Sequence, residues 1–247
     1  MVRKLSKAKE WVLPVLLIVS LALFYTEAFT AKGTKVISPK VILKKLEKKT
    51  PKFQLMAEYP QIAGLKDIAL QNKINILLKE KALSFLPKDL DRMEKEIEPW
   101  AGEGYPYYQN IFSKATYNKG NLMSFKITSE SFWGGAHPAH EGLTLNIELT
   151  KGKLLGLKDF FPKSAYGKLS QLATKKVQSM DELRGYLLIE KVPIDDNTMF
   201  YIKEKEIVIY FPPAEITAYA AGEIEIPLSF LEIKNMLFPY ARKLLRL

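Results

Sequence analysis

A glycine-rich corner between two alternating segments constrains the fold of this chain more than any other stretch. Before the corner, residues 122–131 alternate apolar and polar side chains, and residues 143–150 do the same after it. A period of two with one apolar side is typical of a strand that is buried on one face. Gly134 and Gly135 let the backbone turn where a Cβ atom would clash, and a Lys-Gly-Lys turn follows at 151–153. The sequence therefore predicts two adjacent antiparallel strands of a sheet with one solvent-facing side.

Two longer segments show the 3.6-residue spacing of amphipathic helices. In residues 65–86 an apolar stripe with lysines opposite it ends at Pro87. Asp89 is placed to cap a short second helix that runs to residue 97. Residues 164–183 repeat the helical spacing, and Ser164 is a candidate N-terminal cap. We expect both long helices to pack against the sheet.

These elements predict an α+β fold, in which an antiparallel sheet has helices packed mainly on one face and two subdomains are closely associated. The basic and apolar end of the chain is expected to fray. The predicted organisation is a signal peptide or membrane anchor at 1–31, a lysine-rich linker at 32–51, an N-terminal subdomain at 52–119 and a C-terminal subdomain at 120–247.

The first 31 residues have the features of an export segment. Residues 11–25 carry no charged side chain, and four basic residues precede them. This length and these flanks are typical of a secretory signal peptide. If the segment is not cleaved, residues 11–31 supply the roughly 20 residues that a membrane span needs. A cleaved signal and a retained anchor both stay open.

Lysines dominate the segment that follows. Residues 32–52 contain eight lysines and a single acidic residue, Glu47. We interpret the segment as a solvated linker, and a contact with anionic lipid or wall polymer is the alternative. Because positive residues usually flank the cytoplasmic side of a membrane span, these lysines would also fit an inverted orientation.

Composition narrows the possible chemistry. The chain has no cysteine, which excludes disulfides, thiolate nucleophiles, zinc fingers and lipid-modified cysteines. Its net charge of +10 favours anionic partners, but no nucleic-acid-binding motif accompanies that charge. A nucleophile elbow, a phosphate loop and a dinucleotide fingerprint are all absent from the sequence. The sequence therefore predicts no cofactor and no nucleic-acid partner.

Both histidines of the chain lie at the glycine corner. His137, His140 and Glu141 are residue types that bind metals, but Pro138 and the glycines argue against a helix that would bring them together. We therefore predict no metal site, and we expect His137 to hydrogen-bond backbone groups of the corner. Glu130 and Glu141 flank the corner, and a carboxylate pair held across it would suit glycoside chemistry.

A second unusual segment is rich in aromatic residues. Trp100, Tyr105, Tyr107 and Tyr108 lie among glycines and prolines, as expected of a loop or a strand edge. Such side chains can form a flat platform for sugars or for a protein partner, and we predict a binding site here together with His137. The alternative is that Tyr107 and Tyr108 begin a strand that reaches Tyr117 while Trp100 closes the core.

Three stretches also carry a family resemblance. The first stretch is residues 59–65. The second is residues 132–138, followed by Leu-Thr-Lys-Gly-Lys at 149–153 and Leu-Lys-Asp-Phe-Phe at 157–161. The third is residues 207–222. Together they resemble a family of bacterial extracytoplasmic domains of poorly defined function. The family includes the outer domain of the lysozyme-sensing anti-sigma factor RsiV and the non-catalytic N-terminal part of a peptidoglycan deacetylase. Gly134, Gly135, Pro138 and Gly222 belong to the shared pattern, and we expect structural roles for them.

The resemblance implies a location and a kind of function. It places the protein outside the cytoplasmic membrane, either secreted or anchored by residues 11–31. It implies a non-enzymatic binding domain at the cell envelope that recognises wall polymer, glycan or a secreted wall-directed protein such as lysozyme. The deacetylase activity of the relative belongs to a separate domain, so the resemblance does not imply that activity for this chain. The alternative that stays open is an envelope-polymer hydrolase or deacetylase that uses the His137 region.

Overall fold

The computed structural model describes residues 38–96 and 107–247. By its contacts the chain separates into residues 1–35 and residues 36–247, and only the second part is considered below. The predicted export segment, Trp100 and Tyr105 lie outside the described residues. In the ranges that the structure describes, no helix is long and apolar enough to cross a membrane.

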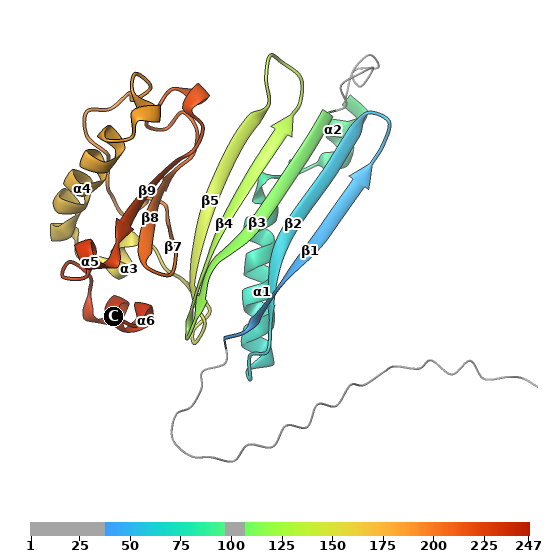
Figure 1. The fold of residues 1–247 in the computed structure, drawn as a ribbon. Coiled ribbons are helices and arrows are strands. Elements are labelled where there is room, and N and C mark those ends of the chain that lie inside the picture. Colours follow the sequence, from blue (N-terminus) through green and yellow to red (C-terminus); the bar gives the residue numbers. More distant parts are fainter. Residues whose placement is uncertain (1–37, 97–106) are drawn as a thin grey trace, which may run out of the picture. The chain divides into compact units, whose positions relative to one another are not determined.

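A six-stranded sheet occupies the N-terminal half of the described chain (Figure 1). All neighbouring strands are antiparallel except β2 and β3, which run parallel, so the sheet is mixed rather than wholly antiparallel. β4 and β5 are the two strands predicted on either side of the glycine corner. The strands lie in the order β1 (Lys40–Lys49), β2 (Phe53–Ala63), β3 (Tyr107–Lys119), β4 (Leu122–Phe132), β5 (Ala139–Glu148) and β6 (Lys153–Leu154).

Strand β1 corrects the prediction of a lysine-rich linker at 32–51. It pairs with β2 along its whole length, from Lys40 opposite Ala63 to Lys49 opposite Gln54. Lysine side chains are common on edge strands, where they discourage pairing with another chain. A lysine-rich composition therefore suits an edge strand as well as it suits a linker.

Helix α1 (Ile68–Ala82) packs against β2 (Figure 1). The carboxylate of Asp67 caps the helix by accepting a hydrogen bond from the Leu70 N–H at 2.9 Å. The Asn75 side chain accepts from the Ile62 N–H at 2.7 Å and donates to the Ile62 carbonyl at 3.0 Å, which fixes the helix to β2. The helix buries Ile74, Leu78 and Ala82, so the predicted apolar stripe faces the core.

A second, three-stranded antiparallel sheet forms the other half of the core. Its strands are β7 (Phe200–Ile202), β8 (Glu206–Phe211) and β9 (Ile224–Ser229), and β8 lies in the middle. Helix α4 (Tyr166–Gln178) packs against β9 on one side of this sheet (Figure 1). The buried cluster that contains the α4 side chains includes Phe200, Ile202, Ile207, Ile209 and Phe211 of β7 and β8, whereas Tyr201, Val208 and Tyr210 form a separate buried cluster. The observed architecture confirms the predicted α+β class.

Buried hydrogen bonds connect the two sheets. The Ser124 hydroxyl on β4 donates to Oδ1 of Asn146 on β5 at 2.7 Å and accepts from the Ile202 N–H at 2.9 Å. Asn146 Nδ2 donates to the Phe200 carbonyl at 2.9 Å. Strand β7 therefore covers part of the sheet face that was predicted to meet solvent, and Ser124 is wholly buried. That prediction was wrong because strand alternation cannot show which polar side chains a second sheet will cover.

Charged residues also lie between the sheets. The Lys126 ammonium on β4 forms ion pairs with Glu223 and, at 2.6 Å, with Glu225. The Tyr210 hydroxyl donates to Glu223 at 2.9 Å. Tyr210 reaches this position because Gly142 on β5 has no side chain: a Cβ there would lie 1.9 Å from the Tyr210 oxygen. These contacts fix the second sheet against β4 and β5.

Shorter helices complete the fold. The helix predicted at 164–183 begins at Tyr166 behind a 3₁₀ turn, so Ser164 does not cap it. The predicted frayed end is instead helix α6 (Pro239–Leu245), which buries Ala241 and Leu245. The remaining short elements are α2 (Leu90–Glu96), α3 (Leu157–Phe160), α5 (Phe230–Ile233) and the 3₁₀ turns Leu83–Phe85, Lys163–Ala165, Asp181–Leu183 and Tyr219–Ala221. As predicted, Asp89 caps α2, through the Arg92 N–H at 2.9 Å.

Candidate functional site

The corner between β4 and β5 (residues 133–138) depends on glycine. The φ angles of Gly134 and Gly135 are 93° and 108°, a backbone region that side-chain-bearing residues rarely adopt. A Cβ on Gly134 would also lie 2.9 Å from the Tyr107 hydroxyl. Gly222, the other glycine of the family pattern, has φ 72° where a 3₁₀ turn leads into β9. The backbone therefore gives a physical reason for the three glycines among the four predicted structural positions, the fourth being Pro138.

We expect Gly135→Val to lower the free energy of unfolding by about 1 kcal/mol, because a β-branched residue is strained at this φ. No atom lies within 4 Å of the added Cβ position, so the loss would come from the backbone and not from a clash. Thermal unfolding measures the effect. Gly135→Asn should lose less stability than Gly135→Val, because asparagine tolerates positive φ better than valine does. Equal melting temperatures for wild type and Gly135→Val would contradict the strained-corner explanation.

One tyrosine contacts both histidines of the corner. Tyr219, on the 3₁₀ turn before β9, stacks on the His137 ring with centroids 4.8 Å apart. Its hydroxyl donates to the Pro138 carbonyl at 2.7 Å and lies 2.9 Å from His140 Nδ1. The His137 Nδ1 atom lies 2.9 Å from the same Pro138 carbonyl, as expected of a histidine that bonds the corner backbone. The predicted corner is therefore held by a residue about 80 positions away in the sequence.

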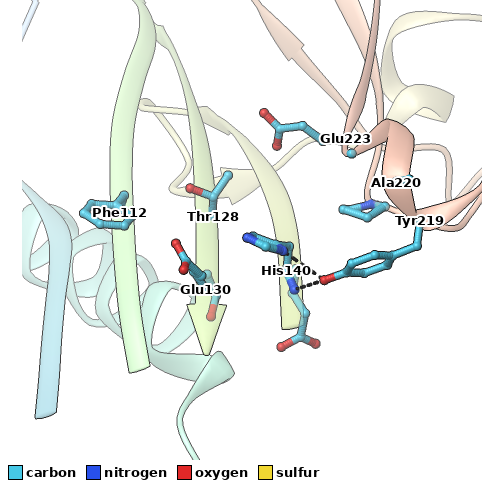
Figure 2. A pocket seen from close by; sticks show the side chains of 11 residues that line it. Phe112, Thr128, Glu130, His140, Tyr219, Ala220 and Glu223 are labelled. Carbon is cyan, nitrogen blue, oxygen red and sulfur yellow. Dashed lines mark hydrogen bonds between the residues drawn. The ribbon is translucent and has the colours of Figure 1, made fainter. Parts of the chain in front are cut away.

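These contacts assign the proton of His140. Tyr219 has one hydroxyl proton, and the Pro138 carbonyl can only accept it. The Tyr219 oxygen must then accept from His140 Nδ1, and it also accepts from the His140 backbone N–H at 3.1 Å. In the neutral ring this leaves His140 Nε2 as a hydrogen-bond acceptor. Figure 2 shows the ring reaching away from Tyr219 towards Thr128 and Glu130.

A cavity of about 470 Å³ opens beside these side chains, and we refer to it as the Tyr219 cavity (Figure 2). β3, β4 and β5 form one wall, and the segment from Pro213 to Glu223 forms the other. The Phe112 ring on β3 is 41% exposed and supplies an apolar surface. The lining residues are Phe112, Thr128, Ser129, Glu130, His140, Glu141, Pro213, Tyr219, Ala220, Gly222 and Glu223.

The register of β4 and β5 argues against the predicted carboxylate pair. Glu130 lies opposite His140, whereas Glu141 lies opposite Ser129. Residues opposite each other share a face of the sheet, and successive residues alternate between faces. The Glu130 and Glu141 side chains therefore point to opposite faces, although both residues border the cavity. The strands bring Glu130 to His140 instead.

The aromatic residues predicted for binding are only partly described. Tyr107 and Tyr108 begin β3, which is the alternative weighed from the sequence, and Tyr107 packs edge-on against Phe132 and Trp133. The Tyr108 hydroxyl donates to Glu130 at 2.5 Å, and this hydrogen bond is the main reason that the Tyr108 pKa is raised to about 12. Tyr108 thus connects the aromatic segment to a residue of the Tyr219 cavity.

Metal-ligating side chains do not converge in the described part of the chain. Within residues 38–96 and 107–247, no group of three or more His, Asp or Glu residues is arranged to hold a metal ion. His137 points its Nδ1 atom at a carbonyl and stacks its ring on Tyr219. The corner is therefore organised by hydrogen bonds and ring stacking.

Sequence reasoning missed most of the cavity residues. The sequence suggests His140 only as a possible metal ligand, and Tyr219 is only one residue of the matched stretch at 207–222. Phe112, Thr128 and Glu223 gave no local signal, since a strand residue shows only its alternation. The available signal was the pair of matched stretches at 132–138 and 207–222, which the fold brings together.

The comparisons with known proteins agree with this architecture. A family model described as "Deacetylase PdaC" matches residues 46–140, and one described as "Protein of unknown function (DUF3298)" matches residues 158–230. No curated protein matches the chain. The chain is thus similar to two families, and each family model covers less than half of it. More particularly, a PdaC-like segment is followed by a DUF3298-like segment, which confirms the resemblance predicted from the sequence.

Solved structures show the same fold. A DUF3298 family member from Bacteroides fragilis superposes with a TM-score of 0.64 at 20% identity, covering 81% of this chain and 94% of the other. A DUF3298 family protein from Pseudomonas aeruginosa gives a TM-score of 0.59 at 13% identity, covering 82% and 95%. The Tyr219 cavity draws residues from both matched segments: Phe112, Thr128, Glu130 and His140 from the first, Tyr219, Gly222 and Glu223 from the second.

Proposed function

We propose that this protein is a non-enzymatic binding domain at the cell envelope and that the Tyr219 cavity is its binding site. The observation that carries the proposal is the meeting of two sequence-matched stretches at one place. The corner at 132–138 and the segment that contains Tyr219 hold each other by stacking and hydrogen bonds. The same contacts build the wall of a cavity that combines apolar rings with a few polar groups, as ligand sites usually do.

The lining favours a glycan as the ligand. Phe112 offers an exposed ring, and the faces of sugar rings pack well on aromatic side chains. The polar groups nearby are mainly acceptors: the carboxylates of Glu130 and Glu223 and, in the neutral ring, Nε2 of His140. Sugar hydroxyl and amino groups supply the donors that such a lining needs. A secreted wall-directed protein such as lysozyme is the other class of ligand, and the experiment below separates the two.

The full chain should bind soluble N-acetylglucosamine oligomers, and Phe112→Ala should weaken this binding about tenfold. An aromatic contact is worth up to about 1.5 kcal/mol, and 1.4 kcal/mol corresponds to a factor of ten. Phe238→Ala is the matched control, because Phe238 is 38% exposed and does not line the cavity. Calorimetry measures the binding, and circular dichroism confirms that each variant is folded.

Several results would contradict the proposal. Equal binding by wild type and Phe112→Ala would place the sugar contact elsewhere, and a loss confined to Trp100→Ala would place it on the aromatic segment predicted from the sequence. Lysozyme binding without any sugar binding would favour the protein ligand. Cleavage or deacetylation of the oligomers by the wild type would favour the enzymatic alternative.

A further inference from the structure

We infer that the edge formed by β1 and the adjoining lysine of α1 is a second contact surface, which binds a linear polymer whose repeating units carry phosphate charges. We call this surface the basic edge and define it by Lys40, Lys44, Lys45, Lys49 and Lys79. It is separate from the Tyr219 cavity, whose lining contains no lysine. The inference therefore stands whether or not the cavity binds a glycan.

The strand turns a lysine-rich composition into an ordered array. The four β1 lysines of the basic edge are all exposed, and alternation along the strand sends Lys44 to one face and Lys45 to the other. Residues four apart, such as Lys40 and Lys44, share a face at a separation of about 13 Å. The lysines therefore form a row on each face of the strand, with Lys40 and Lys44 on one face and Lys45 and Lys49 on the other.

Helix α1 adds a fifth positive charge, that of Lys79, on the face that carries Lys44. Lys44 lies opposite Tyr59 in the β1–β2 register, and the Lys79 ammonium lies 5.6 Å from the centre of the Tyr59 ring. Residues opposite each other in a sheet share a face, so Lys44 and Lys79 flank the same tyrosine. Glu47 on β1 and Glu80 on α1 carry the opposite charge, and Glu58 on β2 pairs with Lys45 at 3.3 Å. The five lysines outnumber these glutamates, so the surface remains positive.

The shape of the basic edge favours a chain-like partner. β1 is the last strand of the six-stranded sheet in the part of the chain that the structure describes. A ten-residue strand is about 33 Å long, and the outward N–H groups of an edge strand are further donors to anionic oxygens. A narrow, straight, positive edge matches an extended polymer with regularly spaced negative charges. A flat membrane surface would contact only part of it.

Long-chain inorganic polyphosphate is the test ligand, and the full chain is used in non-ionic detergent. We expect binding that weakens steeply with added salt, because each neutralised phosphate releases a counterion. Changing Lys40, Lys44, Lys45 and Lys49 together to Gln should weaken binding about tenfold or more and flatten the salt dependence. The matched control changes four exposed lysines elsewhere, Lys158, Lys168, Lys175 and Lys191, to Gln, which gives the same net charge.

Each outcome decides the question. Strong loss in the β1 variant with little loss in the control supports the basic edge, and equal loss in both shows that only overall charge matters. A Lys-to-Arg version of the β1 variant must retain binding, which shows that charge and not altered folding explains the loss. Vesicles of phosphatidylglycerol and phosphatidylcholine are the second ligand. If vesicle binding depends on β1 while polyphosphate binding does not, the partner is a membrane and the inference is wrong.

Discussion

Gly142→Ala should unfold at a clearly lower temperature than the wild type, with a loss of about 3 kcal/mol in the free energy of unfolding. The added Cβ would lie 1.9 Å from the Tyr210 oxygen and 2.7 Å from the ring carbon that carries it. Tyr210 is almost fully buried, so its ring cannot move aside without displacing its neighbours. Overpacking of this kind costs about 1–3 kcal/mol, and the loss of the Tyr210–Glu223 hydrogen bond adds to it.

Gly167→Ala is the matched control for this substitution. Gly167 lies in α4, and a Cβ there meets nothing within 4 Å. Alanine is favoured over glycine in a helix, so this variant should be at least as stable as the wild type. Chemical denaturation of both variants measures the difference. Comparable stability of Gly142→Ala and Gly167→Ala would show that Tyr210 does not need the space above β5.

Lys126→Met should cost about 2 kcal/mol of stability at neutral pH. The Lys126 side chain is only 15% exposed and bridges two carboxylates. Without it, Glu223 and Glu225 would lie close together with no counter-charge between the sheets. Breaking a buried ion pair costs about 3–5 kcal/mol, and the partial exposure of both glutamates reduces that figure. The triple variant with Glu223→Gln and Glu225→Gln should recover most of the loss.

The loss of folding stability caused by Lys126→Met should depend on pH. Burial opposes the charged form of Glu225, but hydrogen bonds from Lys126 and Tyr201 outweigh it, so the Glu225 pKa lies below 4.5. A carboxyl whose pKa is lowered by folding contributes stability at higher pH and loses it as the pH falls through the folded-state pKa. The difference between wild type and variant should therefore be largest near pH 7 and shrink below about pH 4.5. A pH-independent difference would mean that the ion pairs contribute little.

Local patterns predicted those elements whose side chains alternate or repeat regularly. The strands around the glycine corner, the stripe of α1 and the cap at Asp89 follow from spacing, and the structure contains all of them. β1 was misread because an edge strand needs no apolar face of its own. Helix α6 was missed because it has only seven residues, two of them charged, and so short a segment does not show a recognisable helical repeat.

The candidate site could not be predicted because it is made of long-range contacts. Spacing places His140 near Glu130 once the strand register is known, but no local pattern indicates that Tyr219 stacks on His137. Lys126 illustrates the same limit: in the sequence it is one of the polar residues of an alternating strand, and in the fold it is paired between two sheets. Pairings between distant segments decide both cases.

The hydrogen bonds that join Ser124 and Asn146 to β7 have a consequence for any occupant of the Tyr219 cavity. Phe112 belongs to one sheet, whereas Tyr219 belongs to the segment that precedes β9, so a ligand that touches both requires the two sheets to be docked. By mass action, a ligand that binds only the docked form stabilises it, by about 2.7 kcal/mol at a hundred times its Kd. The ligand would then act as a reversible crosslink between the two halves of the domain.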